Sequence, residues 1–361
     1  MFQTAVLAGL WKGRGATANP GGRFERLRRE AFDDGWDSLA EVPPSPRTEV
    51  RPDASRSVIA RNESPDIPFD QSINPYRGCE HGCAYCYARP SHAYLGLSPG
   101  LDFETKLFAK HDAAVLLRRE LARPGYRCQP IALGANTDAY QPVERKYRIT
   151  RRVLEVLAEH RHPVTVVTKS ALVLRDLDLL GEMAAAGLAR VALSITTLDP
   201  GLARKLEPRA AAPHRRLEVM RRLAAAGVPT TVLVAPVIPA LTDHEIEAVL
   251  AAAAAAGAER AGYVLLRLPY EVEELMTAWL ETHVPDRAAR VLALVRQCRG
   301  GRLNDPNFGS RMVGRGAFAD MIRRRFDLAR RRYGFEPRRG PALRTDLFVP
   351  PQPERGQLRL L

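Results

Sequence analysis

The sequence predicts an α/β protein built on a parallel sheet, and two observations lead to this fold class. From residue 72 onward, short runs rich in β-branched residues alternate with amphipathic stretches of helical period, which is typical of successive βα units. From the second strand onward, the strand starts lie about 27 to 39 residues apart, the length of one βα unit. Periodicity alone leaves two arrangements open, a doubly wound open sheet and a barrel or part-barrel.

The expected strands are short and apolar, as strands buried on both faces are. Six segments fit this description, at residues 73–77, 131–135, 164–168, 191–196, 230–237 and 263–268. The first interval is longer than the others, so we expect an insertion in the first crossover. Helices are expected between the strands at 149–160, 174–186, 217–226 and 243–256, and the last three end at glycines, as helices commonly do: Gly187, Gly227 and Gly257.

The pattern divides the chain into three parts. Residues 1–70 form an irregular N-terminal extension rich in Gly, Pro, Arg and Asp, in which short strand-like pieces such as 57–60 can pack on a core. Residues 71–270 form the α/β core. Residues 271–361 form a helical, basic C-terminal extension, with helices expected at 271–282, 287–298 and 317–333 and a Pro- and Arg-rich tail from 337 that wraps or frays.

Composition excludes several classes of protein. The chain has 361 residues, of which 45% are hydrophobic and 26% charged, unlike collagen-like or wholly disordered proteins. Five cysteines are too few for the disulfide framework of a secreted protein. No run approaches the ~18 apolar residues of a membrane helix, and the apolar segment 2–11 lacks the positive region that precedes a secretory signal. We therefore expect a cytoplasmic protein with no membrane partner.

The net charge of +13 favours a polyanionic partner such as nucleic acid. The surplus is concentrated near the C-terminus, where residues 301–361 hold 14 basic and 6 acidic side chains and the expected helix 317–333 carries two runs of three arginines. Two alternatives stay open for the origin of this charge. The basic residues are 48 Arg and 6 Lys, as GC-rich coding would produce, and a basic helix face can simply be solvated.

Three cysteines within eight residues give the strongest signal. Cys79, Cys83 and Cys86 follow a C-x3-C-x2-C spacing, with Tyr85 just before the third. Three thiolates can hold three corners of a 4Fe–4S cube and leave the fourth iron open to a substrate or cofactor. The alternative, a structural zinc site, needs a fourth ligand, for which only His81 lies nearby. The remaining two cysteines, Cys128 and Cys298, are expected to be small buried hydrophobes.

Polar residues follow the expected strands at the rim that carries these cysteines. In parallel βα folds, ligands bind at the carboxyl ends of the strands. The polar strand ends are 136–138 after the second strand, 168–170 after the third, 194–199 at the fourth and 242–243 after the fifth. Each of these residues could equally serve as a turn or cap residue.

The cysteine motif, continued by the βα array over residues 70–270, resembles the radical S-adenosylmethionine (SAM) superfamily. This resemblance implies a partial (β/α)6 barrel of the TIM type, with a 4Fe–4S cluster bound by Cys79, Cys83 and Cys86. It also implies that one electron from the reduced cluster cleaves SAM to methionine and a 5′-deoxyadenosyl radical, which abstracts a hydrogen atom from the substrate. A flavodoxin or ferredoxin is the implied electron donor.

The same resemblance suggests which side chains bind SAM. The end of the second strand, Asn136 to Asp138, lies where the family often has Gly-Gly-Glu, and Thr137 or Asp138 could accept from the SAM ammonium group. A cation is needed for the SAM carboxylate, with Lys169 as the first candidate and Arg209 as the second. The ribose hydroxyls need small polar partners and the adenine an apolar slot, for which the candidates are Ser194, Thr196, Tyr85 and Val237.

Four further segments are similar to a narrower group of bacterial proteins related to spore photoproduct lyase: residues 72–78, 85–89, 137–144 and 194–199. That lyase returns a hydrogen through a cysteine near the end of its second strand, where this chain has Asn136 and Thr137. Another donor such as Tyr140 would therefore be the catalytic residue here. The expected function is a radical SAM enzyme, of lyase or transferase type, acting on a nucleic acid or a nucleotide-like substrate. A peptide or small-metabolite substrate stays open, as does a non-enzymatic iron-sulfur or zinc protein that binds nucleic acid.

Overall fold

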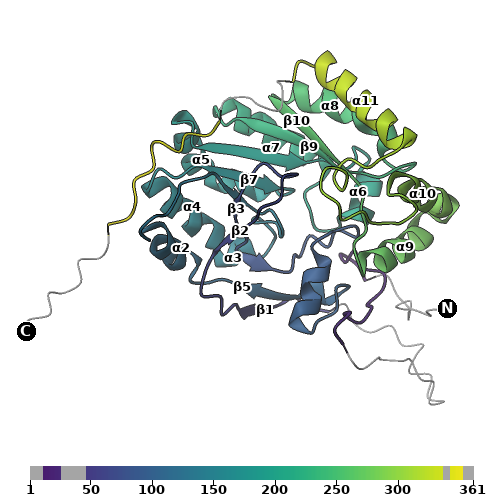
Figure 1. Cartoon of the computed structure of the whole chain (residues 1–361), viewed down its shortest axis with the longest axis horizontal. Coiled ribbons are helices and arrows are strands. Elements are labelled where there is room, and N and C mark those ends of the chain that lie inside the picture. The colour runs from purple at the N-terminus through teal and green to yellow at the C-terminus, as the bar shows by residue number, and fades with distance from the viewer. Residues whose placement is uncertain (1–10, 26–45, 336–341, 353–361) are drawn as a thin grey trace, which may run out of the picture.

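The central element of the fold is an open sheet of seven strands (Figure 1). The structure is a computed structural model, and it describes residues 11–25, 46–335 and 342–352. All neighbouring strands are parallel except the edge pair β2–β3, and the two edge strands do not pair with each other. The strand order is β10(Arg260–Leu265), β9(Thr230–Val237), β8(Ala189–Ser194), β7(Val164–Thr168), β6(Ile131–Leu133), β3(Gln71–Ile73) and β2(Ile59–Arg61). The predicted α/β class with a part-barrel of parallel strands is confirmed.

Helices follow the strands of this sheet, and the longer ones bury one face against it. In α4(Ile149–Glu159), for example, Ile149, Val153 and Leu157 lie one turn apart and are fully buried. Figure 1 shows these helices around the outside of the sheet. The others in the core are α2(Ala113–Leu121), α3(Glu144–Tyr147), η2(Ala171–Asp176), α5(Leu177–Ala185), α6(Pro200–Leu206), α7(Pro213–Ala225), η3(Asp243–Glu245) and α8(Ile246–Ala255).

The expected strand at 73–77 is wrong in part, because the chain leaves the sheet at Asn74 and Pro75. Residues 71–73 form β3, whereas β4(Tyr76–Arg77) joins a second, three-stranded sheet. Proline has no N–H to donate to a ladder. The side chain of Asn74 instead accepts hydrogen bonds from the backbone N–H groups of Asn136 (2.8 Å) and Thr137 (3.3 Å), which holds the break against the end of β6. The other expected strands match observed ones to within three residues at each end.

The second sheet carries the cysteine segment. Its strand order is β1(Glu49–Pro52), β5(Lys106–Ala109) and β4, and the insertion expected in the first crossover lies between β4 and β5. This insertion contains η1(Arg89–Leu95) and α1(Asp102–Thr105). The cysteines therefore follow a strand of the small sheet and not, as the sequence suggested, a strand of the main one.

Both extensions pack on the core. The N-terminal one contributes β1 and β2. The C-terminal one contains α9(Val272–His283), α10(Pro285–Cys298) and α11(Ala317–Arg332), as expected. Residues 303–313 bond to the carboxyl end of β10 and the segment after it, where Met312 O accepts from Leu265 N (2.8 Å) and Leu303 O accepts from Leu268 N (3.0 Å). The division into parts at residues 70 and 270 stays a prediction. Residues after 270 nevertheless bond to the end of β10, the last strand of the core.

The described part of the tail wraps back onto the amino-terminal side of the sheet. Arg344 N donates to Gly187 O and Val349 N to His160 O, each at 3.0 Å, and the Phe348 ring packs against His162. The apolar segment at 2–10 and the last nine residues lie outside the described residues. Of the helices in the described ranges, none has the length and apolarity that a bilayer crossing requires.

We predict that His162 makes the fold less stable in acid. The ring is fully buried beside Tyr126 and Phe348, and burial lowers its pKa to about 4, below the ordinary 6.5. The unfolded chain therefore binds a proton between pH 6.5 and about 4 that the folded chain does not. This contribution is fully present above pH 6.5 and is lost as the pH falls towards 4, by up to about 1.4 kcal/mol per pH unit. Urea unfolding at several pH values should show this slope, and it should be shallower in His162→Gln.

The exposed His214 supplies the control, because His214→Gln should leave the slope unchanged. Equal slopes in His162→Gln and wild type would contradict the prediction.

Candidate iron-sulfur and SAM site

The three cysteines lie on one loop between β4 and η1. Cys79 and Cys83 are 7% and 8% exposed, and Cys86 is half-buried. Two turns shape the loop, in which Gly82 N donates to Cys79 O and Cys86 N to Cys83 O, each at 3.3 Å. Gly82 has a positive φ of 65°, and a Cβ there would lie 2.7 Å from the Glu104 carboxylate, so glycine is required on both counts.

The chemistry of this loop fits a 4Fe–4S cluster. Burial raises the pKa of the Cys79 thiol well above its ordinary value and that of Cys83 to about 12, so a cationic group is needed to hold them as thiolates. Among the described residues, no three His, Cys, Asp or Glu side chains converge as the ligands of one metal ion would. A cube makes a different demand, because each thiolate binds a separate iron. Cys298 is fully buried in the main core, as expected, and Cys128 is half-buried before β6.

A buried ion pair supports the loop from behind. The guanidinium of Arg89 and the carboxylate of Glu104 are both 0% exposed and lie 2.5 Å apart. Arg89 also donates to the carbonyl groups of Cys83 (2.9 Å) and Gly82 (3.1 Å), and to those of Pro99 and Gly100. One side chain therefore fixes the backbone at the second cysteine, and Glu104 balances its charge.

The N-terminal strap, which we define as residues 11–25, completes this support. Glu104 accepts from the backbone N–H groups of Gly15 (3.0 Å) and Ala16 (2.8 Å). A Cβ on Gly15 would lie 1.8 Å from the Gly82 carbonyl oxygen, so the strap crosses the cysteine loop in direct contact. The N-terminal extension is thus part of the cysteine site.

A second buried network holds the other side of the loop. The Tyr85 hydroxyl donates to Glu207 and lies 3.0 Å from the Thr196 hydroxyl, which donates to Glu207 at 2.7 Å. Arg216 pairs with Glu207 and donates to Ser194 O (2.9 Å). Burial alone would raise the pKa of Glu207, but Arg216, Lys169 and the Tyr85 hydroxyl lower it to about 2. The hydroxyls of Tyr85 and Thr196 are thus already bonded to protein groups, which argues against direct SAM contacts through them.

Asp138 organises the ends of β6 and β7. Its carboxylate accepts from the Thr168 hydroxyl (2.7 Å), Lys169 N (2.7 Å) and Tyr140 N (2.8 Å), and His81 Nδ1 lies 3.3 Å away. Burial would raise the pKa of Asp138, but His81 and these donors lower it to about 2. The carboxylate therefore connects the cysteine loop to the sheet and has little capacity left for an ammonium group.

The other predicted SAM contacts differ in how their polar groups are engaged. The Thr137 hydroxyl donates to Tyr76 O (2.7 Å), and the Arg209 guanidinium pairs with Glu80 (3.1 Å). Val237 is fully buried at the end of β9. In contrast, the side chains of three predicted residues form no polar bond with any described residue. These are Lys169, whose ammonium lies 5.9 Å from the Tyr85 ring centroid, the exposed Asn136, and Ser194.

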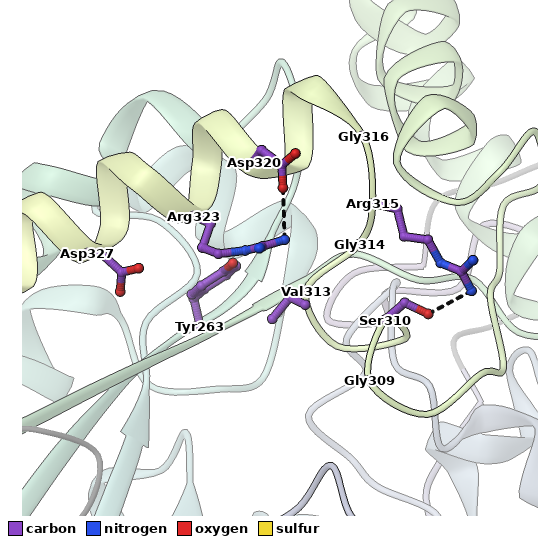
Figure 2. Close-up of a pocket in the computed structure, with 10 residues that line it drawn as sticks. All are labelled: Tyr263, Gly309, Ser310, Val313, Gly314, Arg315, Gly316, Asp320, Arg323 and Asp327. Atoms are coloured by element: carbon purple, nitrogen blue, oxygen red, sulfur yellow. Dashed lines mark hydrogen bonds and ion pairs between the residues drawn. The ribbon is translucent and has the colours of Figure 1, made fainter.

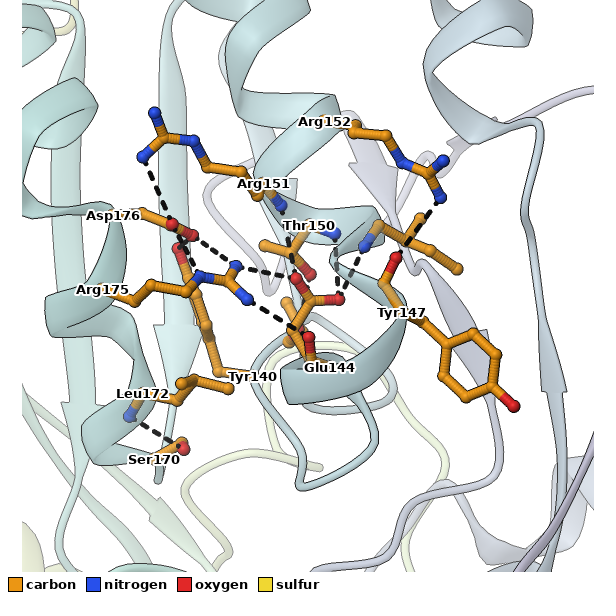
Figure 3. Close-up of polar contacts among 12 residues, drawn as sticks. Tyr140, Glu144, Tyr147, Thr150, Arg151, Arg152, Ser170, Leu172, Arg175 and Asp176 are labelled. Atoms are coloured by element: carbon orange, nitrogen blue, oxygen red, sulfur yellow. Dashed lines mark hydrogen bonds and ion pairs between the residues drawn. The ribbon is translucent and has the colours of Figure 1, made fainter.

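The structure places Tyr140 in a different cluster. Its ring is fully buried, and its hydroxyl donates to Asp176 (3.0 Å), which also binds Arg175 (Figure 3). Glu144 completes this cluster through Arg175 and the first backbone N–H groups of α4. A phenol committed to a buried carboxylate is a poor hydrogen donor for a substrate radical, so the predicted catalytic role of Tyr140 is not supported.

Two residues beside the cysteine loop, Tyr87 and Arg267, receive no role from the sequence. Tyr87 directly follows Cys86, is 47% exposed, and donates its hydroxyl to Ala135 O at the end of β6. Arg267 follows β10 and places its guanidinium 5.1 Å from the centroid of the Tyr87 ring. The sequence does hold a signal for each: Tyr87 is an aromatic residue adjacent to a cysteine, and Arg267 is a charged residue at the end of an expected strand.

Comparison with known proteins gives this site a family. Residues 73–253 match the family model of the radical SAM superfamily. The uncharacterized protein Rv2578c of Mycobacterium tuberculosis is 39% identical over 233 residues, which cover 64% of this chain and 68% of that protein. The uncharacterized protein MJ0683 of Methanocaldococcus jannaschii is 28% identical over 173 residues, or 48% and 62% of the two chains. A solved structure of spore photoproduct lyase complexed with dinucleoside spore photoproduct has a TM-score of 0.56 and 16% identity, covering 79% of this chain and 80% of the other, and so shares the fold.

We predict that Glu104→Gln weakens the cysteine loop. The substitution leaves the Arg89 guanidinium buried without a counter-charge, and breaking a buried pair in this way typically costs about 3–5 kcal/mol. Thermal unfolding should occur at a clearly lower temperature, and anaerobically reconstituted protein should retain less iron.

Glu49→Gln is the matched control, because Glu49 lies on the small sheet with its side chain 52% exposed. Equal melting temperatures for Glu104→Gln and wild type would show that the buried pair does not support the loop.

Proposed function

Because the chain belongs to the radical SAM superfamily, whose members use a 4Fe–4S cluster and SAM, we propose that Cys79, Cys83 and Cys86 hold this cluster. The single observation that carries the proposal is the placement of three thiols on one loop braced from both sides by buried charges. Held by these three thiolates, a reduced cluster would supply the electron for reductive cleavage of SAM, and so the radical chemistry for hydrogen abstraction from a substrate.

The chain's own residues bind and orient SAM. Lys169 is the proposed partner of the SAM carboxylate, because its ammonium lies beside Tyr85 and its charge acts on Cys83. Asn136 and Ser194 offer polar groups that no described residue engages. Tyr85, Thr196 and Asp138 act as positioning residues through Glu207, His81 and the backbone of Lys169.

The substrate that we propose is a nucleic acid or a nucleotide, the class that the net charge of +13 favours. The basic helix α11 gives this idea less support than the sequence suggested. Carboxylates lie against three of its arginines, in the pairs Arg323–Asp320, Arg325–Glu247 and Arg330–Asp327. An electron donor of the flavodoxin or ferredoxin type and a location in the cytoplasm are parts of the same proposal.

We predict that Cys83→Ala abolishes both the cluster and SAM cleavage. Without Cys83, only Cys79 and Cys86 remain to bind the cube. Among the described residues, no fourth cysteine lies on this loop to replace Cys83. Iron and sulfide content, visible absorbance, and 5′-deoxyadenosine formed with dithionite should all fall to background.

Cys128→Ala should behave as wild type in the same assays. Wild-type protein that binds zinc and releases no 5′-deoxyadenosine would support a non-enzymatic binding protein instead, and cleavage retained in Cys83→Ala would refute the assigned ligands.

A further inference from the structure

Arg267 is a half-buried cation without a protein counter-ion among the described residues. Burial is the main effect on its pKa and lowers it, Tyr87 raises it, the charge of Arg311 lowers it and that of Asp66 raises it, with a net lowering. No carboxylate in the described ranges lies within ion-pair distance of its guanidinium, although most other arginines near the site have one. A partly desolvated guanidinium is costly unless an anion accepts its hydrogen bonds.

The position of Arg267 connects it to the reaction site. Its guanidinium stacks on Tyr87, the residue after Cys86, and the Tyr87 hydroxyl reaches Ala135 O at the far side of the strand array. The pair Arg267–Tyr87 therefore joins the end of β10, the cysteine loop and the end of β6. A substrate that donates a hydrogen atom next to the cysteine loop would lie against this pair.

Both chain extensions lie close enough to Arg267 for the charges of Arg311 and Asp66 to act on it. Arg311 bonds to Asp66 (2.7 Å), and its guanidinium lies 4.7 Å from the centroid of the Phe308 ring. Phe308 is 61% exposed and Tyr87 47% exposed. Exposed aromatic rings beside arginines are what proteins use to stack bases while holding the phosphates of a single strand.

The basic residues near α11 form a different environment. A cavity of about 510 Å³ lies between α11 and residues 309–316, and Figure 2 shows Arg315 and Arg323 at its wall. Asp320 and Asp327 line the same cavity, and Arg323 bonds to Asp320 at 2.9 Å. The two arginines and the two aspartates that line this cavity cancel one another's charge, so it is a weaker anion site than Arg267.

We propose that Arg267 binds a phosphate group of the substrate, with Tyr87 and Phe308 available to stack its bases. This inference rests on the proposed function, since it names the substrate chemistry of the same site. The phosphate belongs either to a free nucleotide or to a single-stranded nucleic acid, and the chemistry at Arg267 is shared by both.

The test is fluorescence anisotropy with the cluster-loaded protein, SAM and a labelled single-stranded DNA of about 12 nucleotides, over a salt series and without reductant. Arg267→Gln should weaken binding about tenfold and reduce the salt slope by about one phosphate contact. Arg267→Lys, which keeps the charge, should lose less. Circular dichroism and iron content report whether each variant is folded and loaded.

The matched control is Arg324→Gln, an exposed arginine of α11, which should bind as wild type. Competition by thymidine monophosphate but not by thymidine would assign the phosphate to a free nucleotide; competition by unlabelled strand alone would assign it to a nucleic acid. The proposal would be overturned by wild-type affinity in Arg267→Gln, by equal losses in Arg324→Gln, or by a wild-type protein that binds neither the strand nor thymidine monophosphate. Because binding is measured without reductant, its failure is separate from a failure of SAM cleavage, which the 5′-deoxyadenosine assay measures with dithionite.

Discussion

The buried contact between Arg89 and Glu104 is the constraint on which the cysteine loop depends. A loop of this length has few apolar side chains, so its carbonyl groups need buried donors if it is to stay closed against water. One planar guanidinium supplies two such bonds, two more to the carbonyl groups of Pro99 and Gly100, and one ion pair, which a lysine could not do. Glu104 is in turn satisfied by the strap, so residues far apart in the sequence share one polar network.

The opposite side of the loop follows the same logic with different residues. Glu207 holds the Tyr85 hydroxyl and is neutralised by Arg216, which also binds the end of β8. Asp138 connects the loop to the sheet in a similar way, because its carboxylate lies beside His81 and accepts from the backbone N–H of Lys169 after β7. These carboxylates stay ionised although buried, because each has a cationic or hydrogen-bonding partner. They fix the loop relative to the strand ends. The side-chain polar groups of Lys169, Asn136 and Ser194 bond to no partner within the described ranges of the chain.

The sequence predicted the features that local spacing determines. The cysteine motif, the strand ranges 164–168 and 230–237, and the three C-terminal helices follow from periodicity and residue type. It could not show that Glu104 pairs with Arg89, because no periodic pattern connects residues 15 apart across an irregular insertion. The sequence likewise shows a hydroxyl at Thr196, but it does not show that Glu207 accepts a hydrogen bond from this hydroxyl. The sequence suggests Tyr140 as a hydrogen donor because it lies close to the end of β6 along the chain. Its hydroxyl is instead bonded to Asp176, which comes from another element, η2. The acidic partners of the α11 arginines, in contrast, include residues at i−3 that the sequence does display.

The contacts of the C-terminal extension with β10, through Met312 at its last residue and through Phe326 of α11 beside Tyr263, have a consequence for how this protein can be divided. An open sheet has two edges, and an uncovered edge presents free N–H and C=O groups that can recruit strands from other molecules. The β2 edge is only three residues long, whereas β10 has six. A chain cut after residue 270 would keep every cysteine of the loop and still expose the longer edge, so its most immediate fate would be self-association rather than a smaller working enzyme.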